Sequence, residues 1–170
     1  MQIQTDPKLV KELFSIASPL DTTFVGLLDK EMKLLESHDR FPNLESQNAL
    51  LCEINVIKNF TTVFTHQVSI GFIFTATDFI TNLSMYSFDK KQRNGVSVAI
   101  EVKYFTNERP QAGGKMYVLA VTENFFGNFG FASGYFYDEH FKLFAKGSQI
   151  TYYFNSFWTS AIKNIEKKIK

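Results

Sequence analysis

Residues 69–78 read Ser-Ile-Gly-Phe-Ile-Phe-Thr-Ala-Thr-Asp, and they open a segment that continues to Phe88. From Gln67 to Phe88 the only charged side chain is Asp78. Drawn as a helix, the segment is apolar on nearly every side, which predicts a helix wrapped by other structure. One helical stripe combines Ile70, Ile73, Phe74 and Thr77.

The carboxylate of Asp78 is the feature of this helix that needs an explanation. An unpaired carboxylate is costly to bury, so it requires a hydrogen-bond partner, a proton or access to a water-filled cavity. Asp78 therefore has either a structural or a catalytic role. In the structural alternative, the hydroxyl groups of Thr75, Thr81 and Ser97 satisfy the carboxylate.

Composition limits the function classes. A chain of 170 residues is long enough for one domain with a real core, and a net charge of +1 gives no argument for nucleic-acid or membrane binding. The 19 phenylalanines and 7 tyrosines predict an aromatic core or a large buried interface. Cys52 is the only cysteine, which excludes an internal disulfide and a cysteine-rich metal site and favours a small buried hydrophobe. No metal constellation, phosphate-binding loop or dinucleotide fingerprint is present.

The chain before the central helix is predicted in four pieces. Residues 7–17 have helical spacing behind an Asp-Pro start. Residues 24–35 fit a helix about as well as an irregular strand. Residues 38–47 are polar and predict a surface loop, and Leu50–Ile57 predicts a strand whose Cys52, Ile54 and Val56 share one face.

Four antiparallel strands are predicted after the central helix, at residues 96–104, 115–122, 129–137 and 143–154. In the first of them, Val96, Val98 and later apolar residues alternate with Ser97 and later polar ones. The order of elements is typical of an α+β fold in which a curved sheet wraps a single helix.

The two ends of the chain bear on targeting and on possible partners. Residues 160–170 predict a lysine-rich amphipathic helix that docks on the body, contacts a partner or lies on an anionic membrane surface. The N-terminus shows neither a secretory signal nor an arginine-rich transit peptide. Val68–Phe88 is long enough to span a bilayer but too polar for a simple span.

Several motifs together resemble a known family. They are Cys52-Glu-Ile54, Gly71 placed seven residues before Asp78, Gly95-Val-Ser-Val98 followed by Glu101-Val-Lys-Tyr104, the Pro110 to Gly113 turn, and Leu143-Phe-Ala-Lys-Gly-Ser148. The chain is similar to small single-domain hotdog-fold acyl-CoA thioesterases, such as phenylacetate-pathway and mammalian thioesterase-superfamily proteins. The resemblance implies a hotdog core over residues 49–156, with extensions at 1–48 and 157–170 that add N- and C-terminal helices.

The resemblance also implies a site. Backbone N–H groups at the helix start, including that of Gly71, would polarise the thioester carbonyl, and Asp78 would act as base or nucleophile. Ser97 would hold the attacking water. Ser69, Ile70 and Phe74 would line the substrate site, with acyl-CoA as substrate and no cofactor or metal.

Helix geometry indicates that two chains would be needed to form the predicted site. Seven residues of helix span about 10.5 Å, so Gly71 and Asp78 of one chain cannot both contact one carbonyl. The resemblance implies a two-fold dimer in which each subunit supplies one of the two groups, and a larger assembly is compatible with the predicted extra contact surfaces. It also implies a mitochondrial or cytoplasmic protein, with the mitochondrion as the first expectation.

The helix start departs from the family pattern. The family commonly has His-Gly-Gly there, whereas this chain has Ser69-Ile-Gly71. Two functions therefore follow from the sequence. One is hydrolysis of an acyl-CoA thioester, and the other is a catalytically degenerate hotdog domain that acts as a structural subunit of a larger complex.

Overall fold

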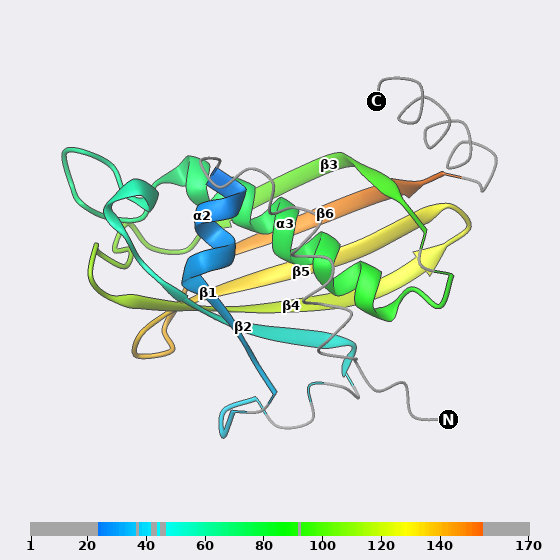
Figure 1. Cartoon of the computed structure of the whole chain (residues 1–170), viewed down its shortest axis with the longest axis horizontal. Coiled ribbons are helices and arrows are strands. Elements are labelled where there is room, and N and C mark those ends of the chain that lie inside the picture. Colours follow the sequence, from blue (N-terminus) through cyan, green and yellow to red (C-terminus); the bar gives the residue numbers. More distant parts are fainter. Residues whose placement is uncertain (1–23, 37, 42–43, 45–46, 92, 155–170) are drawn as a thin grey trace.

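Six β-strands in the described part of the chain form one antiparallel sheet, in the order β1-β2-β4-β5-β6-β3 (Figure 1). The computed structural model describes residues 24–36, 38–41, 44, 47–91 and 93–154. The helices predicted over 7–17 and 160–170 lie outside these ranges. The strands are β1 Met32–Leu35, β2 Ala49–Asn55, β3 Gly95–Tyr104, β4 Lys115–Phe126, β5 Phe129–Asp138 and β6 Leu143–Tyr153.

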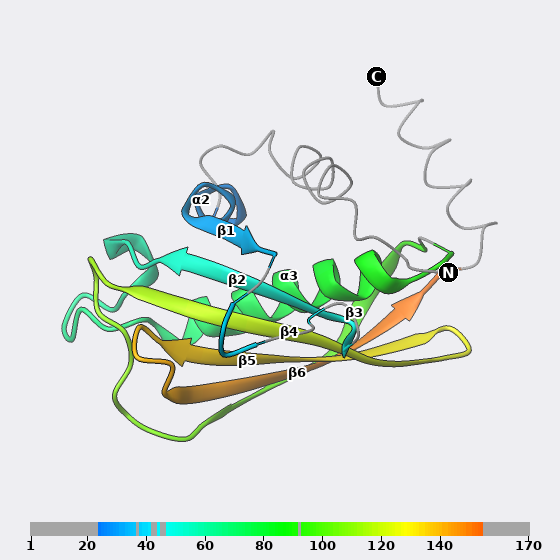
Figure 2. The same ribbon diagram turned by 90° about the horizontal axis from the view of Figure 1, so that it is seen from below.

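Helix α3, Ile70–Phe88, lies along one face of the curved sheet, as Figures 1 and 2 show from two directions. The predicted α+β architecture, with one long central helix and four strands after it, is confirmed. No helix in the residues that the structure describes combines the length and apolar character needed to cross a membrane.

The core lies between α3 and the inner face of the sheet. Ile73, Ala76 and Ile80 from the helix are fully buried there. The strands contribute Cys52, Ile54, Met116, Val118, Ala120, Phe136 and Ala145. The predicted inward face of β2 and the buried position of Cys52 are therefore confirmed.

The prediction that other structure wraps α3 is only partly right. Ile73 and Thr77 of the predicted stripe are fully buried, but Ile70 is 60% and Phe74 is 45% exposed. In a single chain the sheet covers one side of the helix, so these two side chains remain open to solvent at its first two turns.

The ambiguous segment at residues 24–35 contains both predicted elements. Helix α2, Phe24–Glu31, buries Leu28 completely and is followed directly by β1. The next segment, predicted as a surface loop over 38–47, is described only in part. Within it, Phe41 and Leu44 pack against the outer face of the sheet beside Leu51.

Strand β4 is longer than predicted and ends at Phe126 rather than Thr122. The pairing of β4 with β5 shifts by one residue between Thr122 and Asn124 and then continues, so a β-bulge allows the ladder to extend. The hairpin then turns at Gly127, whose φ of 59° suits glycine.

An ion pair fixes the C-terminal end of α3. Arg93 Nε lies 3.0 Å from Asp89 Oδ2, and Arg93 Nη1 donates to the Gly127 carbonyl oxygen at 2.9 Å. Burial alone would raise the pKa of Asp89, but hydrogen bonds from Arg93 and from the Lys91 N–H outweigh it and hold the pKa below its ordinary value. This contact joins the helix end to the β4–β5 hairpin.

Candidate functional site

A close approach between α3 and β6 determines where Asp78 lies. Thr77 is fully buried against Gly147 of β6, and a Cβ atom added to Gly147 would come within 2.2 Å of Thr77 Oγ1. Only glycine leaves room for the helix at this distance. Asp78, the next residue, is consequently held beside the inner face of β6 and β3.

Three side chains donate hydrogen bonds to one oxygen of Asp78. Ser97 Oγ donates to Asp78 Oδ1 at 2.5 Å, Asn82 Nδ2 at 3.0 Å and Gln149 Nε2 at 3.1 Å. No hydrogen bond from a described residue reaches Oδ2. One carboxylate oxygen is thus anchored and the other is left without a protein partner in the described part of the chain.

A second set of contacts ties these donors to one another. Gln149 Nε2 also lies 2.7 Å from Ser97 Oγ and 3.1 Å from Thr151 Oγ1. Thr151 Oγ1 in turn donates to Asn82 Oδ1 at 2.9 Å. Residues from α3, β3 and β6 therefore form one connected polar network.

A β-bulge directs Ser97 toward Asp78. On β6, Thr151 and Ile150 are consecutive, but their partners on β3 are Ser97 and Ala99, so Val98 is an extra residue. Simple alternation along β3 places Ser97 on the face opposite Ile100. The bulge reverses that arrangement, and Ser97 faces α3 together with Ile100.

The start of α3 is open by contrast. Ser69 is the N-cap and its side chain accepts a hydrogen bond from the Phe72 N–H at 3.0 Å. The N–H groups of Ile70 and Gly71 have no acceptor within the helix because they belong to its first turn. A Cβ atom added to Gly71 would meet nothing within 4 Å, so Gly71 is not a packing residue in this chain.

The predicted residues thus fall into two groups. Asp78 and Ser97 are brought together, whereas Ser69, Ile70, Gly71 and Phe74 lie at the open start of the helix. Thr75 and Thr81 do not bond Asp78. Thr75 Oγ1 donates to the Gly71 carbonyl oxygen, and Thr81 Oγ1 contacts the Thr77 carbonyl oxygen and Gln149 Oε1.

Sequence reasoning missed three members of the network, namely Asn82, Gln149 and Thr151. Asn82 is four residues after Asp78, a spacing that places the two on one helix face and could have identified it. Gln149 and Thr151 are buried polar residues on the inner face of β6, and finding them requires the strand pairing.

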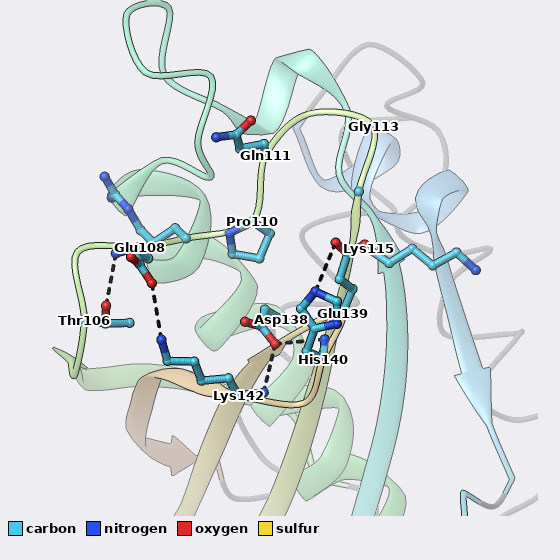
Figure 3. Close-up of a pocket in the computed structure, with 12 residues that line it drawn as sticks. Thr106, Glu108, Pro110, Gln111, Gly113, Lys115, Asp138, Glu139, His140 and Lys142 are labelled. Atoms are coloured by element: carbon cyan, nitrogen blue, oxygen red, sulfur yellow. Dashed lines mark hydrogen bonds and ion pairs between the residues drawn. The ribbon is translucent and has the colours of Figure 1, made fainter.

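A separate pocket of about 430 Å³ lies where residues 106–115 approach the turn at 138–142 (Figure 3). None of the predicted site residues lines it. Its polar groups bond one another: Lys142 Nζ lies 3.2 Å from Glu108 Oε2, and Asp138 Oδ1 accepts from the N–H groups of His140 and Lys142 (Figure 3). The Asp78 network remains the stronger candidate for chemistry.

Two other kinds of site find no support. Among the described residues, no group of three or more His, Cys, Asp or Glu side chains could hold a metal ion. Burial raises the pKa of the Cys52 thiol to about 12, so this residue is not a reactive thiolate at neutral pH.

Comparison with known proteins gives structural matches only. No protein-family model matches the sequence, and no curated protein matches it. The structure is similar to thioesterase superfamily member 2 from zebrafish, with a TM-score of 0.69 and 19% identity over 87% of this chain and 97% of that one. The Mus musculus protein of the same name has a TM-score of 0.66 and 19% identity, over 87% of this chain and 96% of that one. The chain has the hotdog fold.

A third hotdog structure, smu.793 from Streptococcus mutans bound to acetyl CoA, has a TM-score of 0.59 and 11% identity, over 73% of this chain and 89% of that one. The predicted hotdog fold is therefore confirmed. At these identities the likeness concerns the fold, and the chemistry has to follow from the hotdog helix and the side chains around it.

Proposed function

We propose that this protein hydrolyses thioesters of the acyl-CoA type, with Asp78 as the base or nucleophile. The observation that carries the proposal is the carboxylate itself, with Oδ1 held by three donors and Oδ2 free of described partners. Orientation of this kind is what a catalytic carboxylate requires. The resemblance to hotdog thioesterases and the acetyl CoA bound to the similar smu.793 structure support the substrate class.

In the base route, Asp78 Oδ2 takes a proton from water while the water oxygen bonds to the carbonyl carbon. The C–S bond then breaks, and the leaving thiolate receives the proton, which gives a carboxylic acid and a thiol. In the nucleophile route, Oδ2 itself bonds to that carbon, the thiolate leaves, and water cleaves the resulting anhydride. Backbone N–H groups at a helix start would stabilise the oxyanion in both routes.

The active form in this proposal is a two-fold dimer. β3 pairs only with β6 in the described part of the chain, so its ten-residue outer edge is open, with Val96 48% and Val98 54% exposed. Exposed apolar edge strands favour pairing with another strand. A second copy on this edge would also cover Ile70 and Phe74 and would bring Gly71 of one subunit near Asp78 of the other.

The test is hydrolysis of acyl-CoAs of increasing chain length by the wild type, Asp78→Asn and the exposed control Asp39→Asn. We expect Asp78→Asn to lower kcat/KM about 10²- to 10⁴-fold, the usual contribution of a general base, with an unchanged circular dichroism spectrum. Asp39→Asn should match the wild type. Full activity in Asp78→Asn would refute the proposal, and an acyl adduct on Asp78 after rapid quenching would identify the nucleophile route.

A second candidate function is that of a catalytically degenerate structural subunit, mitochondrial or cytoplasmic. It is favoured by the turn before α3, where Val63 is 83% and Phe64 is 96% exposed although internal hydrogen bonds such as His66 N–H to the Thr62 carbonyl oxygen order the turn. An ordered apolar projection of this kind suits a protein partner. In this case a folded dimer would show no turnover and would co-purify with a fixed partner that Phe64→Ser releases.

A further inference from the structure

Gln149 is a fully buried member of the network and contacts both Asp78 and Ser97. Its exposure is 2%, and it lies on the inner face of β6, opposite Ala132 of β5. Burying an amide is costly unless its hydrogen bonds are made. The hydrogen bonds of Gln149 therefore offset the cost of burying its amide.

We propose that Gln149 is a positioning residue, whose amide holds Oδ1 of Asp78 and aims the Ser97 proton so that Oδ2 is the oxygen that reacts. The proposal rests on the thioester hydrolysis proposed above. It concerns a residue that contacts the carboxylate and does not itself reach the reacting atoms.

The orientation of the amide follows from its neighbours. Nε2 faces Asp78 Oδ1 at 3.1 Å and Ser97 Oγ at 2.7 Å, while Oε1 faces the hydroxyl of Thr81. The opposite orientation would put Oε1 beside the carboxylate oxygen, where two acceptors repel each other. Only the amide NH₂ group is compatible with an ionised Asp78.

The neighbours of Ser97 also determine the direction of its hydroxyl proton. Ser97 Oγ lies 2.7 Å from Gln149 Nε2 and 3.2 Å from Asn82 Nδ2, and both amide nitrogens can donate but not accept. A hydroxyl oxygen has two lone pairs and one proton. Because neither amide nitrogen can accept a hydrogen bond, the Ser97 proton points to the carboxylate oxygen Asp78 Oδ1.

The two carboxylate oxygens of Asp78 therefore have different roles in the proposal. Gln149, Asn82 and Ser97 all direct donors at Oδ1 and so hold the carboxylate in one rotamer. Water or substrate then meets Oδ2. Because Gln149 acts through Asp78, its loss should change the rate of the chemical step and leave substrate binding alone.

The experiment compares Gln149→Met, which has similar length but no donor, with Gln149→Glu, which places an acceptor against the carboxylate. We expect kcat to fall about 10- to 100-fold in Gln149→Met, the range for a lost hydrogen bond to a charged group, and further in Gln149→Glu, with KM within about twofold. Thr151→Val removes the hydroxyl that contacts the amides of Gln149 and Asn82 and should lower kcat by a smaller factor. It is the replacement test if Gln149→Met does not fold.

The matched control is Thr122→Val. The Thr122 hydroxyl is buried between β4 and α3 and bonds Ser84 at 2.8 Å, so the variant loses a comparable buried contact away from Asp78. It should lose stability but keep kcat. Equal loss of kcat in Gln149→Met and Thr122→Val would overturn the proposal, because a general loss of structure would explain both.

The outcomes of these experiments distinguish an error in the positioning role from an error in the hydrolase function. If Asp78→Asn abolishes turnover while Gln149→Met keeps it, the positioning role alone is wrong. If the wild type shows no Asp78-dependent turnover, the hydrolase proposal falls and the positioning role falls with it. The side-chain amide resonance of Gln149 supplies a readout besides activity: it should shift in Asp78→Asn, and an unchanged resonance would also count against the contact.

Discussion

The stretch of α3 around Asp78 and the stretch around Gly71 differ in what surrounds them. Asp78 is met by donors from α3, β3 and β6, and its neighbour Thr77 touches Gly147 so closely that no side chain fits there. Around Gly71 there is open space, and Ile70 and Phe74 are exposed. In the proposed site, one chain therefore fixes the acid half by itself, whereas the half proposed to bind the carbonyl is open to solvent.

Gly147→Ala should have the largest effect of the changes that probe this comparison. The added Cβ would lie 2.2 Å from Thr77 Oγ1, so α3 has to move away from β6. Overpacking of this kind costs about 1–3 kcal/mol, and we expect that loss in urea unfolding together with lower activity. Wild-type stability in this variant would show that the contact is easily relieved and does not hold Asp78 in place.

Asp89→Asn tests whether the end of α3 beyond Asp78 is fixed in the same way. Asp89 is buried and accepts hydrogen bonds from Arg93. We expect the substitution to lower the free energy of unfolding by about 1–3 kcal/mol at neutral pH, the range for losing a hydrogen bond to a charged group or leaving a buried polar group without a partner.

The pH dependence gives the sign of this contribution. The pKa of Asp89 is lower in the folded state than its ordinary value of 3.8, so its stabilising effect is complete above that value and is lost as the pH falls through the folded pKa. The wild type and Asp89→Asn should therefore converge in stability toward pH 2 in thermal melts. A constant difference from pH 7 to pH 2 would contradict the assigned cause.

Val98→Lys tests the open outer edge of β3, where the proposal places the second subunit. Val98 is 54% exposed on the outer edge of β3, and a two-fold contact would bring two introduced lysines close together. We expect the dimer dissociation constant to rise about tenfold or more, an effect of roughly 1.4 kcal/mol, in sedimentation at several concentrations. Lys103→Gln, on the same strand, is the control for a change of charge alone. An unaltered dimer in Val98→Lys would place the contact elsewhere.

Gly71→Ala should have the smallest effect on stability, and of opposite sign to Gly147→Ala. Nothing lies within 4 Å of the added Cβ, and alanine is favoured over glycine in a helix, so we expect a gain of about 0.5–1 kcal/mol. Thioester hydrolysis should nevertheless decrease, because the methyl group obstructs approach to the helix start. A loss of stability would mean that Gly71 is already packed against a neighbour.

The sequence was sufficient to predict the central helix and to single out Asp78 as a carboxylate that needs hydrogen-bond partners, because it is the only charge in an apolar segment. It was not sufficient to predict which apolar residues are in the core: Ile70 and Phe74 resemble core residues, and only the arrangement of the sheet shows them exposed. Gln149 contacts Asp78 and Thr151 contacts Asn82, and in both cases the partners on β6 and α3 lie about 70 residues apart in the sequence. Only the arrangement of the strands brings them together.

The extra residue Val98 gives β3 two possible registers with different chemical outcomes. Deleting Val98 would restore one-to-one pairing with β6 and would leave Ser97 facing Asp78. In a chain of unchanged length, absorbing Val98 into a regular ladder would slip the start of β3 by one position and turn Ser97 to the outer face. A one-residue slip would thus disconnect the hydroxyl from the carboxylate while every residue of the site remained in the sequence.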